Sequence, residues 1–367
     1  MSPRHLAAFG APLKAGGHRP YAADMNDTSE GGGGIARRKA DHIDAVLSGG
    51  VGFDGLTTGL EAVRFAHCAL PELSMADIDL SARLFGRPVR LPFLISSMTG
   101  GPARAAGINE TLAEAAEAAG VALAVGSQRI ALEARGGVGL GGDLRRRCPS
   151  VPLIGNLGAA QLRGADAADL ARAGLDMIGA DGLFVHLNPL QEAVQSGGDT
   201  DWRGVLAGIE RLTRAGLPVA VKEVGFGLSA AVVRRLAGAG VGVIDVAGAG
   251  GTNWARVEGV RGGALGTVAE AFADWGVPTA QAVADARAAA PEATIIASGG
   301  LRDGVDAAKA IRLGADLAGY AGAVLDAATR GAEAVTDWFA AREAELRAAC
   351  LCTGSADLAA LRGAPLL

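Results

Sequence analysis

The sequence has few aromatic residues and few cysteines, and these shortages exclude several classes of protein. Aromatic side chains make up 4% of the 367 residues and the net charge is −5, which argues against a protein that stacks nucleic-acid bases on its surface. The four cysteines form no CxxC pair and no zinc-binding spacing. No uncharged apolar stretch reaches the roughly 18 residues of a membrane helix, and a signal peptide's apolar segment is missing. We therefore expect a cytoplasmic enzyme that binds neither membrane nor nucleic acid.

What the sequence does contain is glycine and aliphatic residues. Half of the residues are hydrophobic, and 56 of the 367 are glycine. This composition is typical of a large aliphatic core surrounded by glycine-rich loops. Lysine is scarce, since only Lys14, Lys39, Lys222 and Lys309 stand among the 34 basic residues. A lysine inside a chemical motif is therefore more informative than usual.

From about residue 90, short apolar runs alternate with segments of helical periodicity. Each run has the length and the flanks of a buried parallel strand. The eight runs are Leu91–Ser96, Val121–Gly126, Pro152–Asn156, Gly182–Leu187, Pro218–Lys222, Gly242–Val246, Thr294–Ser298 and Leu317–Ala321. Eight strand–helix units of this size predict an α/β protein with a (β/α)8 TIM barrel, and a doubly wound open sheet is the structural alternative.

The same spacing defines the expected domain organisation. The long interval after the sixth run predicts an excursion above the barrel. We expect the barrel domain to span residues 37–345, including a basic arm at its start. Residues 1–36 have no sustained periodicity and are predicted to be a flexible tail, and 346–367 are predicted to be a C-terminal tail.

Polar residues follow the apolar runs directly. Because the carboxyl ends of barrel strands converge on one face, these side chains are expected to meet in one mouth, where barrels bind their substrates. The last two runs end in the glycine-rich loops ASGGLRDG (Ala297–Gly304) and GYAGAVL (Gly319–Leu325). Glycine permits close backbone approach and a helix N-terminus attracts anions, so these loops predict a phosphate site to which Arg302 adds a charge.

Three further segments carry candidate chemistry. Lys222 ends the fifth strand, where a buried lysine serves either as a Schiff-base amine or as a hydrogen-bond donor to an electron-rich cofactor ring. The segment HLNPLQE (His186–Glu192) places Glu192 in a helix's first turn, where it can bind a divalent cation whose other ligands come from a diphosphate. Basic residues in RRKADHIDAVL (Arg37–Leu47) can clamp the same diphosphate.

Taken together, these segments resemble the type 2 isopentenyl diphosphate isomerases, which depend on flavin. The resemblance covers about residues 37–330. The motifs that carry it are RKADH (Arg38–His42), TTGLEAVRFAHCALPEL (Thr57–Leu73), LISSMTGG (Leu94–Gly101), VGSQR (Val125–Arg129), GNLGAAQL (Gly155–Leu162), HLNPLQE, DWRG (Asp201–Gly204), KEVGFG (Lys222–Gly227), DVAGAGGTNWARVE (Asp245–Glu258) and DWGVPTA (Asp274–Ala280).

The resemblance implies an FMN-binding barrel that interconverts isopentenyl diphosphate and dimethylallyl diphosphate, with NADPH as the flavin reductant and Mg2+ as metal. It also implies a homo-oligomer, a tetramer or larger. The implied catalytic residues are His186 and Gln191, and Glu192 is the implied metal ligand. The implied substrate-binding residues are Arg38, Lys39, Ser127, Gln128, Arg129 and Gln191. The implied flavin-binding residues are Ser97, Met98, Thr99, Ser127, Asn156, Lys222, Thr252, Gly300, Leu301, Arg302, Ala321 and Gly322.

An FMN-dependent oxidoreductase of the α-hydroxy-acid type is the functional alternative. Such an enzyme needs a histidine base late in the barrel, whereas the last of the five histidines here is His186. Purine-nucleotide dehydrogenases on this fold need a cysteine in the loop at Gly248–Asn253, and this loop has none. The isomerase is therefore the favoured reading.

Overall fold

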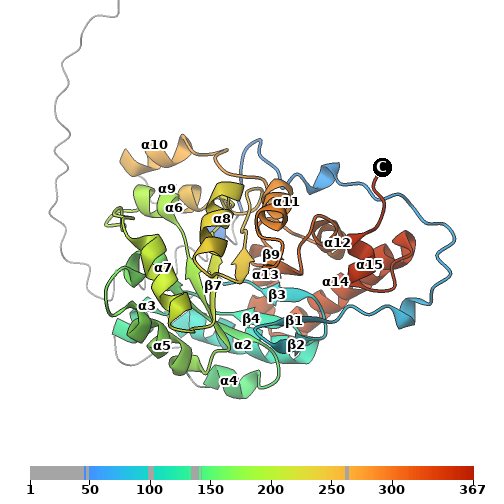
Figure 1. Cartoon of the computed structure of the whole chain (residues 1–367), viewed down its shortest axis with the longest axis horizontal. Helices are drawn as coiled ribbons and strands as arrows, with labels where there is room; N and C mark the ends of the chain where they lie inside the picture. Colours follow the sequence, from blue (N-terminus) through green and yellow to red (C-terminus); the bar gives the residue numbers. More distant parts are fainter. Residues whose placement is uncertain (1–44, 47–48, 98–102, 134–139, 142, 261–263) are drawn as a thin grey trace, which may run out of the picture.

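The predicted strands close into a barrel (Figure 1). The computed structural model describes residues 45–367 apart from 47–48, 98–102, 134–139, 142 and 261–263. The barrel strands are β3 (Phe93–Ile95), β4 (Ala122–Ala124), β5 (Leu153–Gly158), β6 (Gly182–His186), β7 (Val219–Lys222), β8 (Val243–Asp245), β9 (Thr294–Ala297) and β10 (Leu317–Tyr320). They pair in parallel in this order, and β10 returns to β3. The predicted TIM barrel is confirmed, and the open-sheet alternative is wrong.

Helices surround the barrel and cover its strands (Figure 1). Those that follow strands in sequence include α2 (Ala103–Ala119), α5 (Ala167–Ile178), α7 (Val205–Arg214), α8 (Ala230–Gly238), α11 (Thr279–Ala289), α12 (Gly304–Arg312) and α13 (Gly322–Arg330). Local capping helps to start several of them: the Asp303 side chain accepts the Asp306 N–H at the start of α12. Shorter elements are η1 (Leu60–Ala62), η2 (Met75–Asp77), η3 (Ala159–Leu162), α3 (Arg129–Glu133), α4 (Asp143–Arg147) and α6 (Pro189–Val194).

The long interval between β8 and β9 contains the predicted excursion. It begins with α9 (Trp254–Gly259) and α10 (Ala264–Glu270), and only then returns to α11. Asn253 caps α9 by accepting the Arg256 N–H at 3.1 Å. The excursion therefore adds structure beside the carboxyl end of β8.

A hairpin lies against the opposite, amino-terminal end of the barrel. It consists of β1 (Ala82–Leu84) and β2 (Arg87–Val89). Its residues Leu84 and Val89 pack in one cluster with barrel-lining side chains such as Phe184. Phe85 lies so close to Gly182 that a Cβ on that glycine would stand 2.4 Å from its ring. The hairpin thus fills one end of the barrel and leaves the other for a pocket.

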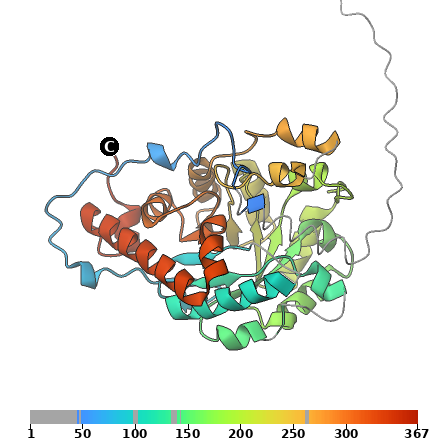
Figure 2. The same cartoon turned by 180° about the vertical axis from the view of Figure 1, so that it is seen from behind.

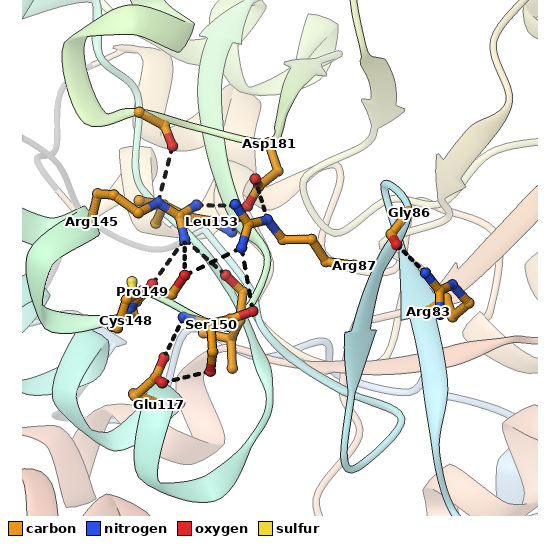
Figure 3. A network of polar contacts seen from close by, with 12 residues as sticks. Arg83, Gly86, Arg87, Glu117, Arg145, Cys148, Pro149, Ser150, Leu153 and Asp181 are labelled. Carbon is orange, nitrogen blue, oxygen red and sulfur yellow. Dashed lines mark hydrogen bonds and ion pairs between the residues drawn. The ribbon is translucent and has the colours of Figure 1, made fainter.

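Asp181 links three parts of the chain at this end (Figure 3). Its carboxylate pairs with Arg87 of β2 and with Arg145 of α4, and it accepts the N–H of Leu153 at 2.9 Å. Asp316 repeats the arrangement half a barrel later: it pairs with Arg287 at 2.6 Å and accepts the Ile295 N–H at 2.8 Å. Both networks hold the amino ends of barrel strands, whereas the predicted mouth lies at the carboxyl ends.

The C-terminal residues are packed structure. Helix α14 (Ala332–Thr353) lies against α2, α12 and α13 (red in Figure 2), and α15 (Leu358–Arg362) follows it. Four side chains of α14 are buried, among them Leu346 and Cys350. The predicted boundary at 345 therefore falls inside a helix, and 346–367 pack against the barrel instead of forming a separate tail. The predicted N-terminal tail lies outside the described residues. Within the described chain, no helix is both long and apolar enough to span a membrane.

Candidate active site

A pocket of about 800 Å3 lies at the carboxyl ends of the barrel strands, and residues at the ends of all eight strands line it. Most of the predicted site residues meet there. They are Ser97, Ser127, Arg129, Asn156, His186, Gln191, Glu192, Lys222, Thr252, Gly300, Leu301, Arg302, Ala321 and Gly322. Arg38, Lys39, Met98 and Thr99 lie outside the described residues.

Gln128 is the predicted substrate-binding residue that the structure places elsewhere. Its side chain is fully buried behind the pocket wall. The amide donates to Gly174 O at 2.8 Å and accepts the N–H of Asn156 at 2.8 Å. Both ends of the amide are therefore engaged inside the protein. Gln128 supports the backbone of β5, and its neighbour Ser127 is the one that lines the pocket.

The orientation of His186 is set through Asn156. The Asn156 amide nitrogen donates to the main-chain oxygen of Val125 at 3.1 Å, so its Oδ1 is left as the acceptor. His186 Nδ1 lies 2.8 Å from that Oδ1 and therefore carries the proton that it donates. The main chain just after β4 thus fixes the ring of His186, the last residue of β6, through the Asn156 amide of β5.

Lys222 is a buried cation at the base of the pocket. Its side chain is 5% exposed, and Nζ donates to the main-chain oxygen of Glu223 at 2.5 Å. Burial lowers the pKa of Lys222, while the negative charges of Asp245 and Glu223 raise it. Asp245 is the register neighbour of Lys222 on β8. The buried carboxyls of Asp245 and Glu223 therefore favour the protonated form of Lys222, which can donate a hydrogen bond to an anionic or electron-rich ligand.

Glu223 is itself fully buried and holds the loop that follows β7. Its Oε2 accepts the N–H groups of Val224, Gly225 and Phe226 at 2.5–2.7 Å. Burial raises the pKa of Glu223 to about 7, against the lowering effect of these three donors. Val224 and Gly225 line the pocket, so this carboxyl shapes one of its walls.

Buried polar atoms without a partner mark the same region. Four buried side-chain atoms of the described residues have no hydrogen-bond partner: the hydroxyls of Ser96 and Ser97, Oδ2 of Asp245 and, away from the pocket, Nε of Arg362. Such groups are costly unless a ligand or water satisfies them. Ser96 and Ser97 both line the pocket. Together with Lys222 and Asn156 they fit the polar edge of a flavin ring.

The HLNPLQE segment forms a linked group of polar side chains at the start of α6. Asn188 donates to Gln191 Oε1 at 3.1 Å and to Glu192 Oε1 at 2.9 Å. Glu192 Oε2 accepts the N–H of Asp199 at 2.7 Å. Gln191 donates to Glu258 of α9 at 2.9 Å. These bonds fix the Gln191 amide and the Glu192 carboxylate at the pocket wall.

The HLNPLQE segment contains one carboxylate, Glu192, that could bind a metal ion. The described residues contain no group of three or more His, Cys, Asp or Glu side chains that could hold an ion. A divalent cation at Glu192 needs further ligands, which a diphosphate could supply. The metal role of Glu192 therefore remains a proposal.

The two glycine-rich loops lead into helices α12 and α13, and the starts of these helices differ in how well they suit a phosphate. Carboxylates already accept the N–H groups around the start of α12: Asp306 accepts from Arg302, Glu345 from Gly304, and Asp303 from Asp306. By contrast, α13 begins after Ala321, and within the described chain no side chain caps it. An anionic phosphate is attracted to the uncapped N-terminus and repelled by the three carboxylates. The start of α13 therefore fits a phosphate better than the start of α12 does.

The pocket lining also contains residues that were not among the predicted site residues. They include Val46, Ser96, Gln161, Gln195, Ser196 and Trp254. Glu258, buried behind Gln191, belongs with them. Gln161 and Glu258 stand in motifs of the resemblance and are isolated polar residues among apolar ones, a pattern that could have marked them as buried polar groups.

Comparisons with known proteins agree with this geometry. A family model described as FMN-dependent dehydrogenase matches residues 187–366. Among solved structures, a mandelate oxidase has a TM-score of 0.62 at 18% identity, covering 91% of this chain and 98% of its own. A flavocytochrome b2 variant with bound pyruvate has a TM-score of 0.63 at 16% identity, covering 89% and 81%. At these identities the structural neighbours support the fold alone, and the predicted barrel of the FMN-binding type is confirmed.

Curated relatives are much closer in sequence. The isopentenyl-diphosphate delta-isomerase of Xanthobacter autotrophicus is 62% identical over 335 residues, which cover 91% of this chain and 98% of the relative. The proteins of the same name from Stutzerimonas stutzeri and Cronobacter sakazakii are 58% and 56% identical, covering 91% and 90% of this chain and 97% and 96% of their own length. The chain belongs to the isopentenyl-diphosphate delta-isomerase family.

Proposed function

We propose that this protein interconverts isopentenyl diphosphate and dimethylallyl diphosphate with the help of reduced FMN. The observation that carries the proposal is the pocket at the carboxyl ends of the strands, where fourteen predicted site residues line one cavity. The isomerase relatives, which match about nine-tenths of the chain, support the same reaction. The reaction moves one proton onto a carbon and removes another, so it has no net redox change.

The flavin site consists of residues on both sides of the barrel mouth. Lys222, Asn156 and the unpaired Ser97 hydroxyl would hold the polar edge of the ring. The start of α13, at Ala321 and Gly322, would hold its phosphate, with the charge of Arg302 on the neighbouring loop. When bound, reduced FMN supplies an acid–base group beside an electron-rich ring. The protein's own task is to place that ring and keep water away from it.

The substrate diphosphate belongs at the open side of the pocket. Arg129 lies in the lining and pairs with Glu133 at 2.9 Å and Asp199 at 3.4 Å, so its guanidinium is held near the wall. Glu192 would bind Mg2+ together with diphosphate oxygens, and Arg38 and Lys39 would complete the clamp. Divalent metal and guanidinium groups together neutralise a diphosphate and fix its orientation.

Two residues would orient the carbon chain. His186 presents its ring edge to the pocket with Nδ1 committed to Asn156. Gln191 is held by Glu258 and Asn188 and cannot rotate without losing both bonds. Rigid placement of this kind lowers the entropic cost of bringing an alkene to a proton donor.

Further parts of the proposal concern the reductant, the assembly and the compartment. NADPH is proposed as the flavin reductant, and the cytoplasm as the location. A tetramer or larger homo-oligomer is proposed from the family resemblance, and exposed apolar side chains on the excursion are consistent with self-association: Val260 and Trp275 are 67% and 60% exposed.

The test is anaerobic conversion of isopentenyl diphosphate with FMN, NADPH and Mg2+, with a parallel reaction that omits the reductant. Dimethylallyl diphosphate is expected only when the flavin is reduced. A protein that binds and reduces FMN but forms no product would contradict the proposal. Oxidation of a hydroxy acid by such a protein would favour the oxidoreductase alternative.

A further inference from the structure

Residues 51–58 form a strap that packs on the loops after β8 and β9 (within the blue part of the chain in Figure 1). The strap is paired with the excursion: Val51 O accepts the N–H of Asn253 at 2.8 Å, and Gly52 forms a bridge with Thr252. Just before the strap, Val46 lines the pocket, and its Cγ1 would lie 3.5 Å from a Cβ on Gly322. Val46 therefore lies at the end of the pocket where α13 begins.

The far end of the strap packs directly on two pocket loops. A Cβ added to Gly250 would lie 2.3 Å from the backbone nitrogen of Thr58, and one added to Gly300 would lie 2.6 Å from Thr58 Cγ2. Thr58 is 4% exposed, and its carbonyl accepts the N–H of Ala280 at 2.9 Å. Because Gly250 and Gly300 both line the pocket, a shift of the strap would release the loops beneath it.

Asp274 anchors the middle of the strap. Its Oδ1 accepts the N–H groups of Asp54, Gly55 and Leu56 at 2.9, 2.9 and 3.0 Å, and its Oδ2 also lies 3.1 Å from the Gly55 nitrogen. One carboxylate thus binds three consecutive backbone donors, which is a strong charge-assisted arrangement. These donors lower the pKa of Asp274. Asp274 itself is exposed and is not part of the pocket lining.

Arg256 holds the strap from the other side. It donates to Gly52 O at 2.9 Å and pairs with Asp54 at 2.7 Å. It also pairs with Glu270 at 3.2 Å. Glu270 bonds Arg256 and makes no direct bond to the strap among the described residues. It therefore provides a matched position: an exposed carboxylate on the same excursion whose neutralisation leaves the direct bonds of Asp274 and Arg256 to the strap in place.

We propose that Asp274 is a positioning residue that locks the strap over the glycine loops after β8 and β9 and thereby slows the escape of the flavin. Asp274 acts through Thr58 and the loops, without touching the ligand. The inference rests on FMN binding in the pocket, as proposed above. It concerns how long the flavin stays bound, and so it goes beyond the reaction itself.

The experiment measures FMN dissociation from the reconstituted full-length protein by the recovery of flavin fluorescence after dilution. Asp274→Asn is expected to speed dissociation about tenfold, the effect of losing one charge-assisted interaction. Arg256→Leu is expected to act in the same direction. Glu270→Gln should stay within about twofold of wild type. Hydrogen exchange should increase in peptides covering 51–58 in the first two variants and not in the third.

Each outcome decides the inference. Unchanged FMN dissociation in Asp274→Asn, despite faster exchange in the strap, would show that the strap does not retain the flavin. Unchanged exchange would show that Asp274 does not anchor the strap. Equal acceleration by Glu270→Gln would assign the effect to surface charge. If the wild-type protein binds no FMN, the proposed function is wrong. This result differs from one in which FMN binds but Asp274 has no effect on its dissociation.

Discussion

The side chains of the pocket are oriented by neighbours that are distant in the sequence. Val125 fixes Asn156, and Asn156 fixes His186, over two gaps of about thirty residues. Lys222 depends on a carboxylate of the next strand, Asp245, for a nearby opposite charge. Substitutions at this level are therefore expected to change ligand binding more than the fold.

Lys222→Met tests the buried cation. Methionine keeps most of the length of the side chain and removes the charge, so we expect FMN affinity to fall about tenfold or more while the circular dichroism spectrum is unchanged. The physical reason is the loss of a desolvated charge next to an electron-rich ligand. Fluorescence titration with FMN measures the effect. Lys309→Met, on α12, is the matched control, and equal FMN affinity in both variants would remove Lys222 from the flavin site.

Glu223→Gln tests the raised carboxyl pKa. In the folded protein the pKa is about 7, and in the unfolded chain it returns to about 4.5. Between these values the folded state holds a proton that the unfolded state has lost, so stability falls as pH rises. Glutamine has no such proton and keeps an acceptor for the loop N–H groups.

The measurement is urea unfolding of both proteins at pH 5 and pH 7.5. The stability of wild type relative to Glu223→Gln should fall by about 2 kcal/mol between the two pH values, since one pKa unit corresponds to roughly 1.4 kcal/mol. A constant difference would mean that Glu223 is ionised throughout this range.

At this scale the sequence predicted which residues gather and missed how they are held. Residues that end apolar runs, such as Asn156 and Lys222, reach the pocket because barrel strands converge at one end. Gln128 was misplaced because a residue beside a pocket residue can point the opposite way, and the sequence does not show which. Glu258 was missed because its partner, Gln191, is 67 residues away.

The strands and helices differ in how clearly they can be predicted from the sequence. All eight barrel strands were predicted because a strand buried on both faces is a continuous apolar run. Helix α14 was missed because its buried positions, including Val335 and Phe339, are spread among alanine and charged residues over 22 residues. The hairpin was missed because its short strands, ARL and RPV, contain arginine and proline and therefore form no continuous apolar run.

Asp181→Ala tests the role of the elements at the amino-terminal end. The change removes the partner of Arg87 and Arg145 and the acceptor for the Leu153 N–H, so we expect a loss of about 3 kcal/mol in the free energy of unfolding. FMN affinity should stay within twofold, because this network lies at the opposite end of the barrel from the pocket. Urea unfolding measures the loss of stability, and FMN titration measures the affinity. A large loss of FMN affinity would show that the amino-terminal network also contributes to ligand binding.

At the scale of the whole molecule, ligand binding in the pocket changes the free energy of unfolding of the entire barrel. A ligand that binds only the folded state adds to the free energy of unfolding, by about 2.7 kcal/mol at a hundredfold excess over Kd. The size of this stabilisation reports how much of the ligand the folded barrel recognises. Comparing this stabilisation for ligands with and without a phosphate therefore distinguishes the contribution of the phosphate end at α13 from that of the ring edge near Lys222.

FMN and riboflavin differ by the phosphate, so their effects on thermal unfolding test the phosphate end. FMN at a hundredfold excess over its Kd is expected to raise the midpoint by a few degrees, and riboflavin at the same concentration should raise it clearly less. The reason is that Ala321 and Gly322 offer an uncapped helix start to the phosphate, whereas carboxylates occupy the start of α12. Asp181→Ala should unfold at a lower temperature and show the same difference between the ligands. Equal stabilisation by FMN and riboflavin would mean that the phosphate does not contribute to binding, and the assignment of α13 would fall.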